Sequence, residues 1–496
     1  MNTRKIVLSF AAVAACVCGA FGGETVYYAA PNGTGSGASP DDPTDLLTAF
    51  GKCGNGTGWD KATKNYSKIV LAAGDYDFSK TMREDTSTVL NLMTINKDRN
   101  RYIWFQGAVN AGGSPASRII GGGPELNMRL LYAQNASSAF RMESLCITNF
   151  GSSTASGGAI DSYVSTDYGC FMSNCEFRCC SATTRGAISS GSRIPAYDCK
   201  FVGNRFTGVT TQTGLTGCGA CISLTCIRCL FENNGHPTPE VLNKYHGGAV
   251  CDCDCYGCAF VGNRAHSTSA LACTSKTGIK VIDCVFTNNT SYYSGGGTIV
   301  GVGSQPVVTN CVFYGNILSA GDVVSNVAAT NCRFMKNSAP EVLGPGCMAR
   351  NCLVYDNPCT FDNVCSCTVI NCLFMSNVSN SRVVNGAVSI KNCVFYGNVK
   401  PSGTPSAIKH ANATIEASVS NAAEVPSCFT CDADEVPTGI LRNKASKNLL
   451  IDKGVDVGWT ADDRDLAGNA RVFNDIVDIG CFEWPGPFPG LMLILR

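Results

Sequence analysis

The sequence carries no excess of charge, and it contains no run of basic residues. Its 496 residues include 38 Lys and Arg, 38 Asp and Glu, and only 4 His. Proteins that bind nucleic acid present a clustered cationic surface to the phosphate backbone. The composition therefore argues against nucleic acid as a partner.

Long hydrophobic runs are also missing after the first residues. Residues 1–23 hold Arg4 and Lys5, then an apolar stretch, then small residues, which predicts a secretory signal peptide. An alternative is a lipid on Cys16, because the residues before it resemble the box that precedes a lipidated cysteine in bacterial lipoproteins. No other stretch reaches the roughly 18 apolar residues of a membrane-spanning helix. We expect a mature chain that is exported, extracellular or at the bacterial cell surface, without a transmembrane segment.

Helical periodicity is scarce, and a short motif recurs in its place. The segment NCVFYGN occurs at 310–316 and again at 392–398, with related copies of a Cys, an apolar residue two positions later and an Asn three further on. Successive Cys of this motif are 20 to 30 residues apart, a spacing typical of repeat architectures. The motif residues are Cys199, Phe201, Asn204, Cys229, Phe231, Asn234, Cys258, Phe260, Asn263, Cys284, Phe286, Asn289, Cys311, Phe313, Asn316, Cys332, Phe334, Asn337, Cys372, Phe374, Asn377, Cys393, Phe395 and Asn398.

Each repeat reads as short strands separated by turns. In a strand, side chains two positions apart share a face, so Cys311 and Phe313 both point inward. Gly and Asn, which tolerate left-handed backbone angles, follow as a turn, and Gly-Gly-Ala segments at Gly157 and Gly247 begin a second strand. Propeller blades need about 40 to 50 residues and are excluded. The pattern predicts an all-β fold, a single-stranded right-handed parallel β-helix in which equivalent Cys, Phe and Asn residues stack as ladders.

The period also predicts the organisation of the chain. We expect an N-terminal cap and the first coils in residues 24–140, the repeats in 141–400, and the last coils with a C-terminal cap in 401–496. Residues from about 449 onward break the period, and we expect them to close the end of the stack, with salt bridges in the Asp462–Asp465 run. A cap protects the last strands from pairing with other chains.

The 31 cysteines allow two interpretations in an exported chain. Stacked Cα atoms lie within the range that a disulfide spans, but buried thiols also pack as small apolar groups. We expect packed thiols at the ladder positions, and disulfides among the additional cysteines. Those additional cysteines are Cys218, Cys221, Cys226, Cys359, Cys365 and Cys367.

The stretch CDCDCYGC at 251–258 is a possible metal site. Strand alternation would place its first three Cys on one face and Asp252 and Asp254 on the other. Three alternating Cys from one strand seldom complete a zinc tetrahedron. Core packing or disulfides are therefore favoured, and no metal is predicted, with Asp252 and Asp254 as weak candidates only.

The same two carboxylates are the best candidates for catalysis if the chain is an enzyme. Glycosidic bond cleavage uses two carboxylates about 5 to 9.5 Å apart, and Asp252 and Asp254 would be about 7 Å apart on a strand, with Lys244 and His246 close in sequence. The favoured interpretation is that they are outward-facing, solubilising residues. No catalytic residue and no cofactor is predicted, and calcium is expected only for an enzyme.

The alternating GGA[IV] and FxxN tetrapeptides resemble the repeats of the polymorphic outer-membrane protein family. FVGN at Phe201 and Phe260, FYGN at Phe313 and GGAV at Gly247 carry this resemblance, which implies a surface adhesin. The N-terminal region is similar to the cap of the pectin-lyase-like fold, which implies a carbohydrate-active enzyme as the alternative, either a polysaccharide lyase or a glycosidase. We expect a non-catalytic, adhesin-like scaffold that binds a glycan or a cell-surface protein.

Overall fold

The computed structural model describes residues 25–53, 67–81, 85–95, 102–134, 138–153 and 156–484, with gaps at 165, 167–168, 208–216, 237–245, 294, 361, 381, 387–388, 407–413, 441–447, 461 and 474. The predicted signal peptide, Cys16 and Lys244 lie outside these residues. Within the described part of the chain, no helix is long and apolar enough to cross a membrane.

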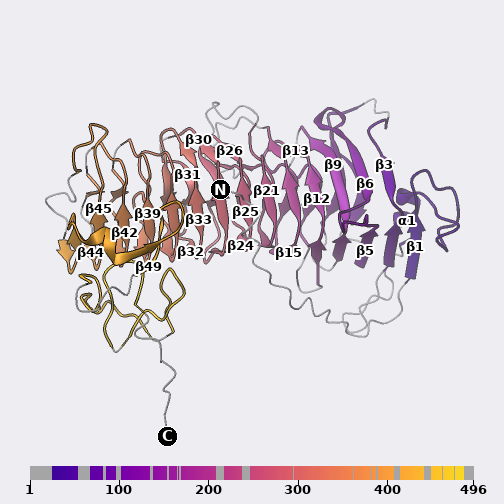
Figure 1. Ribbon diagram of the computed structural model, residues 1–496. Coiled ribbons are helices and arrows are strands. Elements are labelled where there is room, and N and C mark those ends of the chain that lie inside the picture. Colours follow the sequence, from indigo (N-terminus) through magenta and orange to yellow (C-terminus); the bar gives the residue numbers. More distant parts are fainter. Residues whose placement is uncertain are drawn as a thin grey trace, which may run out of the picture.

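The chain winds into an elongated solenoid of parallel strands (Figure 1). The predicted fold class, a right-handed parallel β-helix, is confirmed. One wall is a 15-stranded sheet to which each coil adds one strand. Its strands are β1 (Thr25–Ala29), β2 (Ser67–Leu71), β5 (Tyr102–Gly107), β8 (Ala139–Glu143), β11 (Phe171–Ser173), β15 (Ile194–Tyr197), β20 (Leu224–Ile227), β24 (Asp254–Tyr256), β28 (Lys280–Ile282), β32 (Val307–Thr309), β36 (Ala328–Thr330), β38 (Met348–Arg350), β41 (Thr368–Ile370), β44 (Ser389–Lys391) and β46 (Thr414–Glu416).

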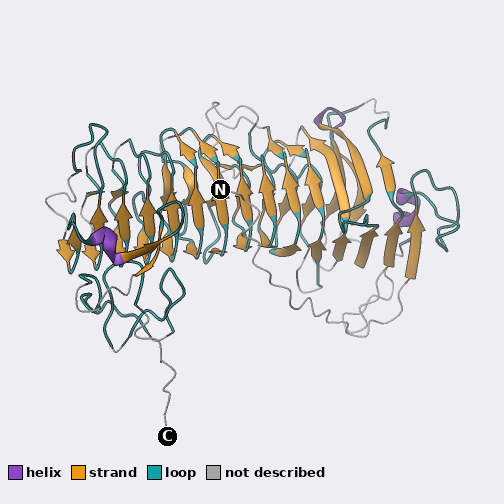
Figure 2. Cartoon of the chain, viewed as in Figure 1, coloured by secondary structure: helices purple, strands orange, loops and turns teal. Residues whose placement is uncertain are grey.

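A second wall carries the repeated motif, and short strands after it complete each coil (Figure 2). The motif strands are β9 (Leu145–Ser152), β12 (Glu176–Arg178), β16 (Lys200–Val202), β21 (Leu230–Glu232), β25 (Ala259–Val261), β29 (Val285–Thr287), β33 (Val312–Tyr314), β37 (Arg333–Met335), β39 (Leu353–Tyr355), β42 (Leu373–Met375), β45 (Val394–Tyr396) and β47 (Val419–Ser420). The completing strands include β14 (Ile188–Ser190), β17 (Arg205–Phe206), β19 (Cys221–Ile222), β23 (Val250–Cys251), β26 (Arg264–Ala265), β27 (Thr268–Cys273), β31 (Gly297–Gly301) and β35 (Asp322–Ser325).

The motif phenylalanines stack inside the solenoid. From Phe177 to Phe334, consecutive rings have centroids 4.6 to 5.2 Å apart and planes within 10° of parallel. Val354 takes the place of a ring in the next coil, and Phe374 stacks on Phe395 beyond it. The column forms because parallel pairing brings the same position of each coil into register.

The motif asparagines form a second buried column at the turn. Asn289 donates from its backbone N–H and its Nδ2 to Asn316 Oδ1, both at 3.0 Å, and its Nδ2 also donates to the carbonyl of Phe260. The same pattern joins each asparagine to the next along the solenoid. We call this column the asparagine ladder; its members are Asn204, Asn234, Asn263, Asn289, Asn316, Asn337, Asn357, Asn377 and Asn398.

The motif cysteines are buried free thiols. Cys311 Sγ, for example, lies 3.3 Å from the carbonyl oxygen of Thr309 and 3.5 Å from that of Val281. The pairing predicted for the additional cysteines is wrong where it can be read, because their side chains pack into the interior as thiols as well. The free thiols include Cys218, Cys221, Cys226 and Cys359. Cys367 is buried with its Sγ 2.9 Å from the carbonyl oxygen of Gly344, and the side chain of Cys365 is outside the described set.

The N-terminal end of the interior is covered by α1 (Leu46–Lys52), beside β1 in Figure 1. Asp45 caps this helix by accepting from the N–H of Thr48. Its apolar side buries Leu46 and Ala49, and the ring of Phe50 stacks on Phe105 with centroids 6.4 Å apart. The helix therefore extends the aromatic interior to the first coils.

The C-terminal segment, from about residue 425 to residue 484, packs along the outside of the solenoid. The expectation that it closes the end of the stack is therefore wrong. It includes β48 (Phe429–Cys431) and β49 (Pro437–Ile440) and lies against the last coils in Figure 1. It covers Leu353, Leu373 and Val394, which face outward from the motif strands. The equivalent position of the preceding coil holds Arg333, whose Nη2 donates to the carbonyl of Leu466 in the segment.

Candidate functional site

Asp252 is a buried structural residue, so its interpretation as an outward-facing, solubilising side chain is wrong. It lies at the corner between β23 and β24 with a φ of 51°, which breaks the strand alternation assumed from the sequence. Its carboxylate accepts from the backbone N–H and the hydroxyl of both Thr274 and Ser275, at 2.7 to 3.2 Å. These bonds use the oxygens that a calcium ion or a substrate would need.

Asp254 is buried as well and is also occupied. It forms an ion pair with Arg193 at 2.5 Å and accepts from the N–H of Lys280 at 3.0 Å. Of His246 only the backbone, in β22 (His246–Gly247), is described. The proposed pair of co-facial acids is therefore two separate structural contacts.

The acidic run of the C-terminal segment lines a cavity of about 570 Å³ between that segment and the solenoid. Asp463 accepts from the N–H and hydroxyl of Thr460. Asp465 accepts from the N–H groups of Ala467 and Asn469, and from that of Glu483 at 2.6 Å. Within the described residues neither carboxylate makes a salt bridge, contrary to the expectation, because backbone donors hold both of them in tight turns.

A buried acid that the sequence did not single out is Asp322 in β35. Burial, and the neighbouring charge of Glu341, raise its pKa to about 8. Gly344 of the following coil leaves room for it, since a Cβ there would lie 1.8 Å from Asp322 Oδ2. Raised carboxyl pKa values often mark functional sites, but structural burial produces them too.

Replacing Asp322 with Asn should stabilise the fold at pH 8 and leave it nearly unchanged at pH 4. An acid whose pKa is raised on folding loses stability as pH rises from its unfolded value near 4 to its folded value near 8, because only the unfolded state ionises there. One pKa unit corresponds to about 1.4 kcal/mol, and we expect at least that gain. Urea denaturation at the two pH values measures it. The exposed Asp356→Asn is the control, and an equal shift at both pH values would contradict the prediction.

The clearest open site lies on the turn that follows the asparagine ladder. The residue after each ladder asparagine faces outward, and in three successive coils it is Arg205, Gly235 and Arg264, paired in register. The two arginines are therefore two coil spacings apart, about 10 Å between Cα atoms. Gly235 leaves a gap between them, and we call this gap the arginine notch.

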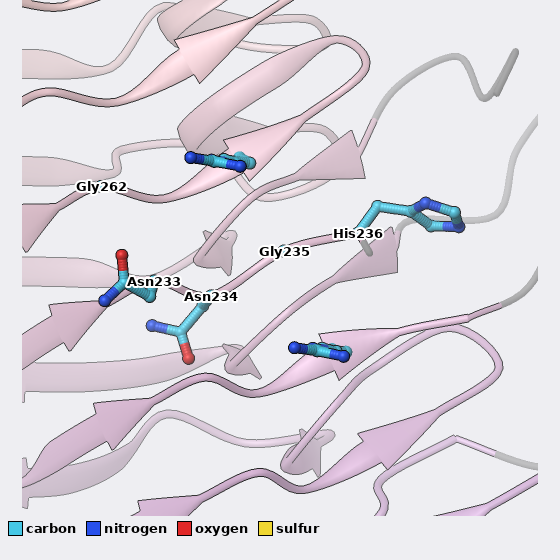
Figure 3. Close-up of a pocket in the computed structure, with 7 residues that line it drawn as sticks. Asn233, Asn234, Gly235, His236 and Gly262 are labelled. Atoms are coloured by element: carbon cyan, nitrogen blue, oxygen red, sulfur yellow. The ribbon is translucent and has the colours of Figure 1, made fainter. Parts of the chain in front are cut away.

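The notch is a cavity of about 290 Å³ lined by Arg205, Asn233, Asn234, Gly235, His236, Gly262 and Arg264. Figure 3 shows Asn233 and His236 on opposite sides of Gly235. Gly235 has a φ of 136°, and a Cβ on it would lie 1.7 Å from the carbonyl oxygen of Arg264. No other residue fits this position, so the gap is fixed by the backbone.

The electrostatics of the notch favour an anion. Its lining contains two guanidinium groups and the amide of Asn233 but no carboxylate. Both arginines are exposed, and neither makes an ion pair with a described residue. His236 is buried against the ring of Phe206, with centroids 5.1 Å apart. Guanidinium groups bind carboxylate, sulfate and phosphate groups through paired N–H donors.

Sequence reasoning missed these residues although a signal was present. FVGN is followed by Arg205 and by Arg264, and FENN between them is followed by Gly235. Aligning the position after the motif across coils places two arginines around one glycine. The motif residues singled out from the sequence are all interior, so they support the notch from beneath but do not line it, except for Asn234.

No protein-family model matches the sequence, and no curated protein sequence matches it. The resemblance to the polymorphic outer-membrane protein repeats therefore rests on short motifs alone. Pectate lyase Pel9A is similar over 93% of this chain and 96% of its own, at 12% identity and a TM-score of 0.25. The A-module of mannuronan C-5 epimerase AlgE6 from Azotobacter vinelandii is similar over 76% of this chain and 99% of its own, at 13% identity and a TM-score of 0.26. For the lacto-N-biosidase of Eubacterium ramulus the shares are 80% and 68%, at 11% identity and a TM-score of 0.29.

Proposed function

We propose that this chain is an exported, non-catalytic β-helix protein that binds an acidic glycan, a polysaccharide with carboxylate or sulfate groups, across the arginine notch. The observation that carries the proposal is a cavity flanked by Arg205 and Arg264 whose lining contains no carboxylate. Export rests on the leader-like residues 1–23.

The geometry of the solenoid suits a linear polymer. Repeat proteins present extended surfaces along their length, and the two arginines follow each other along the solenoid axis. Their Cα atoms are about 10 Å apart, two coil spacings along the axis. Acidic groups on a glycan chain could thus meet both arginines at once, and Gly235 lets the chain approach the backbone between them.

The proposal is tested by binding of the mature chain to acidic and neutral polysaccharides at two salt concentrations. We expect retention of an acidic glycan that weakens with salt, because exposed charges are screened. Each arginine changed to Gln should weaken binding at least tenfold, since a hydrogen bond to a charged group contributes about 1.5 to 3 kcal/mol.

The matched control is Arg228→Gln, an exposed arginine already paired with Asp198 at 2.7 Å. This variant should bind as the unchanged protein does. Equal retention of neutral glycans, or unchanged binding by the double variant Arg205→Gln with Arg264→Gln, would contradict the proposal.

The same polysaccharides separate binding from catalysis. No unsaturated product and no new reducing end should form on prolonged incubation, with or without calcium. Either product would favour the alternative, a lyase or glycosidase of the pectin-lyase-like type, over a binding scaffold.

A further inference from the structure

Three cysteines outside the motif column meet inside the solenoid. The Sγ atoms of Cys221, Cys226 and Cys253 all lie within 4.8 Å of one another, and all three side chains are fully buried. They come from β19, from β20 and from the segment just before β24, so the fold gathers them from two successive coils. We call them the thiol cluster.

The neighbouring coils show that packing does not require cysteine at these positions. Cys221 is in register with Ile188 on one side and Val250 on the other. Cys226 is in register with Ala196. Cys253 precedes the paired residues Asp254 and Thr225, which places it level with Leu224. An aliphatic side chain therefore fills each of the three interior columns in at least one neighbouring coil.

A fourth thiol adjoins the cluster. Cys255 is in register with Cys226, in the coil that also carries Cys253. The cluster therefore offers three donors of one soft type, with a fourth thiol next to Cys226 and no carboxylate among them.

The spacing of the cluster matches metal–thiolate geometry. A metal–sulfur distance of about 2.3 Å puts the sulfurs of a trigonal site about 4.0 Å apart and those of a tetrahedral site about 3.8 Å apart. Both values lie within the observed limit of 4.8 Å. The N–H of Leu224 donates to Cys253 Sγ at 3.3 Å, an interaction that stabilises a thiolate.

We propose that Cys221, Cys226 and Cys253 bind a thiophilic d10 metal ion, Zn²⁺ or Cu(I), inside the solenoid. Three sulfurs complete a trigonal Cu(I) site. Tetrahedral Zn²⁺ requires a fourth ligand, and Cys255, in register with Cys226 but outside the group of three, would have to move closer to supply it. Each coordinating thiol releases its proton to solvent, and no redox change is involved. The positive ion offsets the cost of burying thiolates. Because the cluster is buried, the ion enters during folding and holds two coils together.

The experiment measures metal on the full chain, refolded separately with Zn²⁺ and with Cu(I) and then desalted. About one ion per chain should remain, with metal–sulfur distances near 2.3 Å by X-ray absorption. Three sulfurs in the first shell identify Cu(I), and four identify Zn²⁺. The loaded protein should also unfold at a higher temperature than the metal-free protein.

The test variants copy residues that neighbouring coils already use, so the fold should tolerate them. Cys226→Ala and Cys221→Val should each lower the retained metal at least tenfold. Cys311→Ala, at an equally buried motif position away from the cluster, should retain it. Metal that stays bound in both cluster variants, no retained metal in the unchanged protein, or a disulfide among the four cysteines of the folded chain would each overturn the proposal.

Discussion

Replacing Asn289 with alanine should destabilise the solenoid by about 3 to 6 kcal/mol, because several buried polar groups lose their partners together. Its Oδ1 accepts from both the backbone N–H and the Nδ2 of Asn263, at 3.0 and 2.9 Å. Its Nδ2 donates to Phe260 O and to Asn316 Oδ1. With the side chain removed, donors and acceptors in two neighbouring coils remain buried without water.

Denaturant unfolding followed by circular dichroism measures this effect, and the chain provides an adjacent control. Asn288 is exposed and has a φ of 55°, a conformation that glycine adopts at the equivalent positions 262 and 315. Asn288→Gly should therefore change stability by about 0.5 kcal/mol or less. A similar loss in both variants would show that the turn, and not the ladder, carries the energy.

Replacing Arg471 with leucine should release the C-terminal segment at a cost of about 3 to 5 kcal/mol, the usual penalty for removing one partner of a buried ion pair. Arg471 is fully buried and pairs with Glu483 at 3.0 Å. It also donates to the carbonyls of Asp478, Gly480 and Phe482, at 2.7 to 3.1 Å. Burial raises the pKa of Glu483, and the guanidinium opposes that shift, so its loss leaves a buried acid without a cation.

Limited proteolysis of the segment, followed by mass spectrometry, measures its release. The exposed Lys453→Leu should be cut no faster than the unchanged protein. The double variant Arg471→Leu with Glu483→Gln should recover part of the protection, because it removes the unpaired charge. Equal protection of the Arg471→Leu variant would show that the apolar contacts to Leu353 and Leu373 hold the segment alone.

The interior of this protein could be predicted from its sequence because residues that repeat at one coil length stack on one another in the solenoid. Residues such as Cys311, Phe313 and Asn316 recur at one coil length, and parallel pairing converts that recurrence into contact. The placement of Asp252 could not be predicted from alternation, since a left-handed residue at a corner ends the strand. Reading each coil alone also concealed the arginine notch, which exists only across three coils.

The lateral docking of the C-terminal segment was hidden for a different reason. Its signal is an apolar column on the outside of the last coils, at Leu353, Leu373 and Val394. In the sequence of a single strand, these apolar residues cannot be distinguished from residues that face the interior. Their register with Arg333 of the preceding coil shows that they face outward. Periodicity identifies what repeats, whereas a docking surface is a local departure from the repeat.

The side-chain amide dipoles of the asparagine ladder all point the same way along the solenoid axis. Every ladder amide turns its oxygen toward the preceding coil, where it accepts from that coil's N–H groups. Side-chain dipoles aligned in this way do not cancel, and each polarises the next. The bonds at the middle of the column are therefore strengthened by coils that they never touch. Deleting one coil should weaken the ladder hydrogen bonds of the remaining coils. The free energy of unfolding per coil should therefore depend on the number of coils as well as on the contacts within each coil.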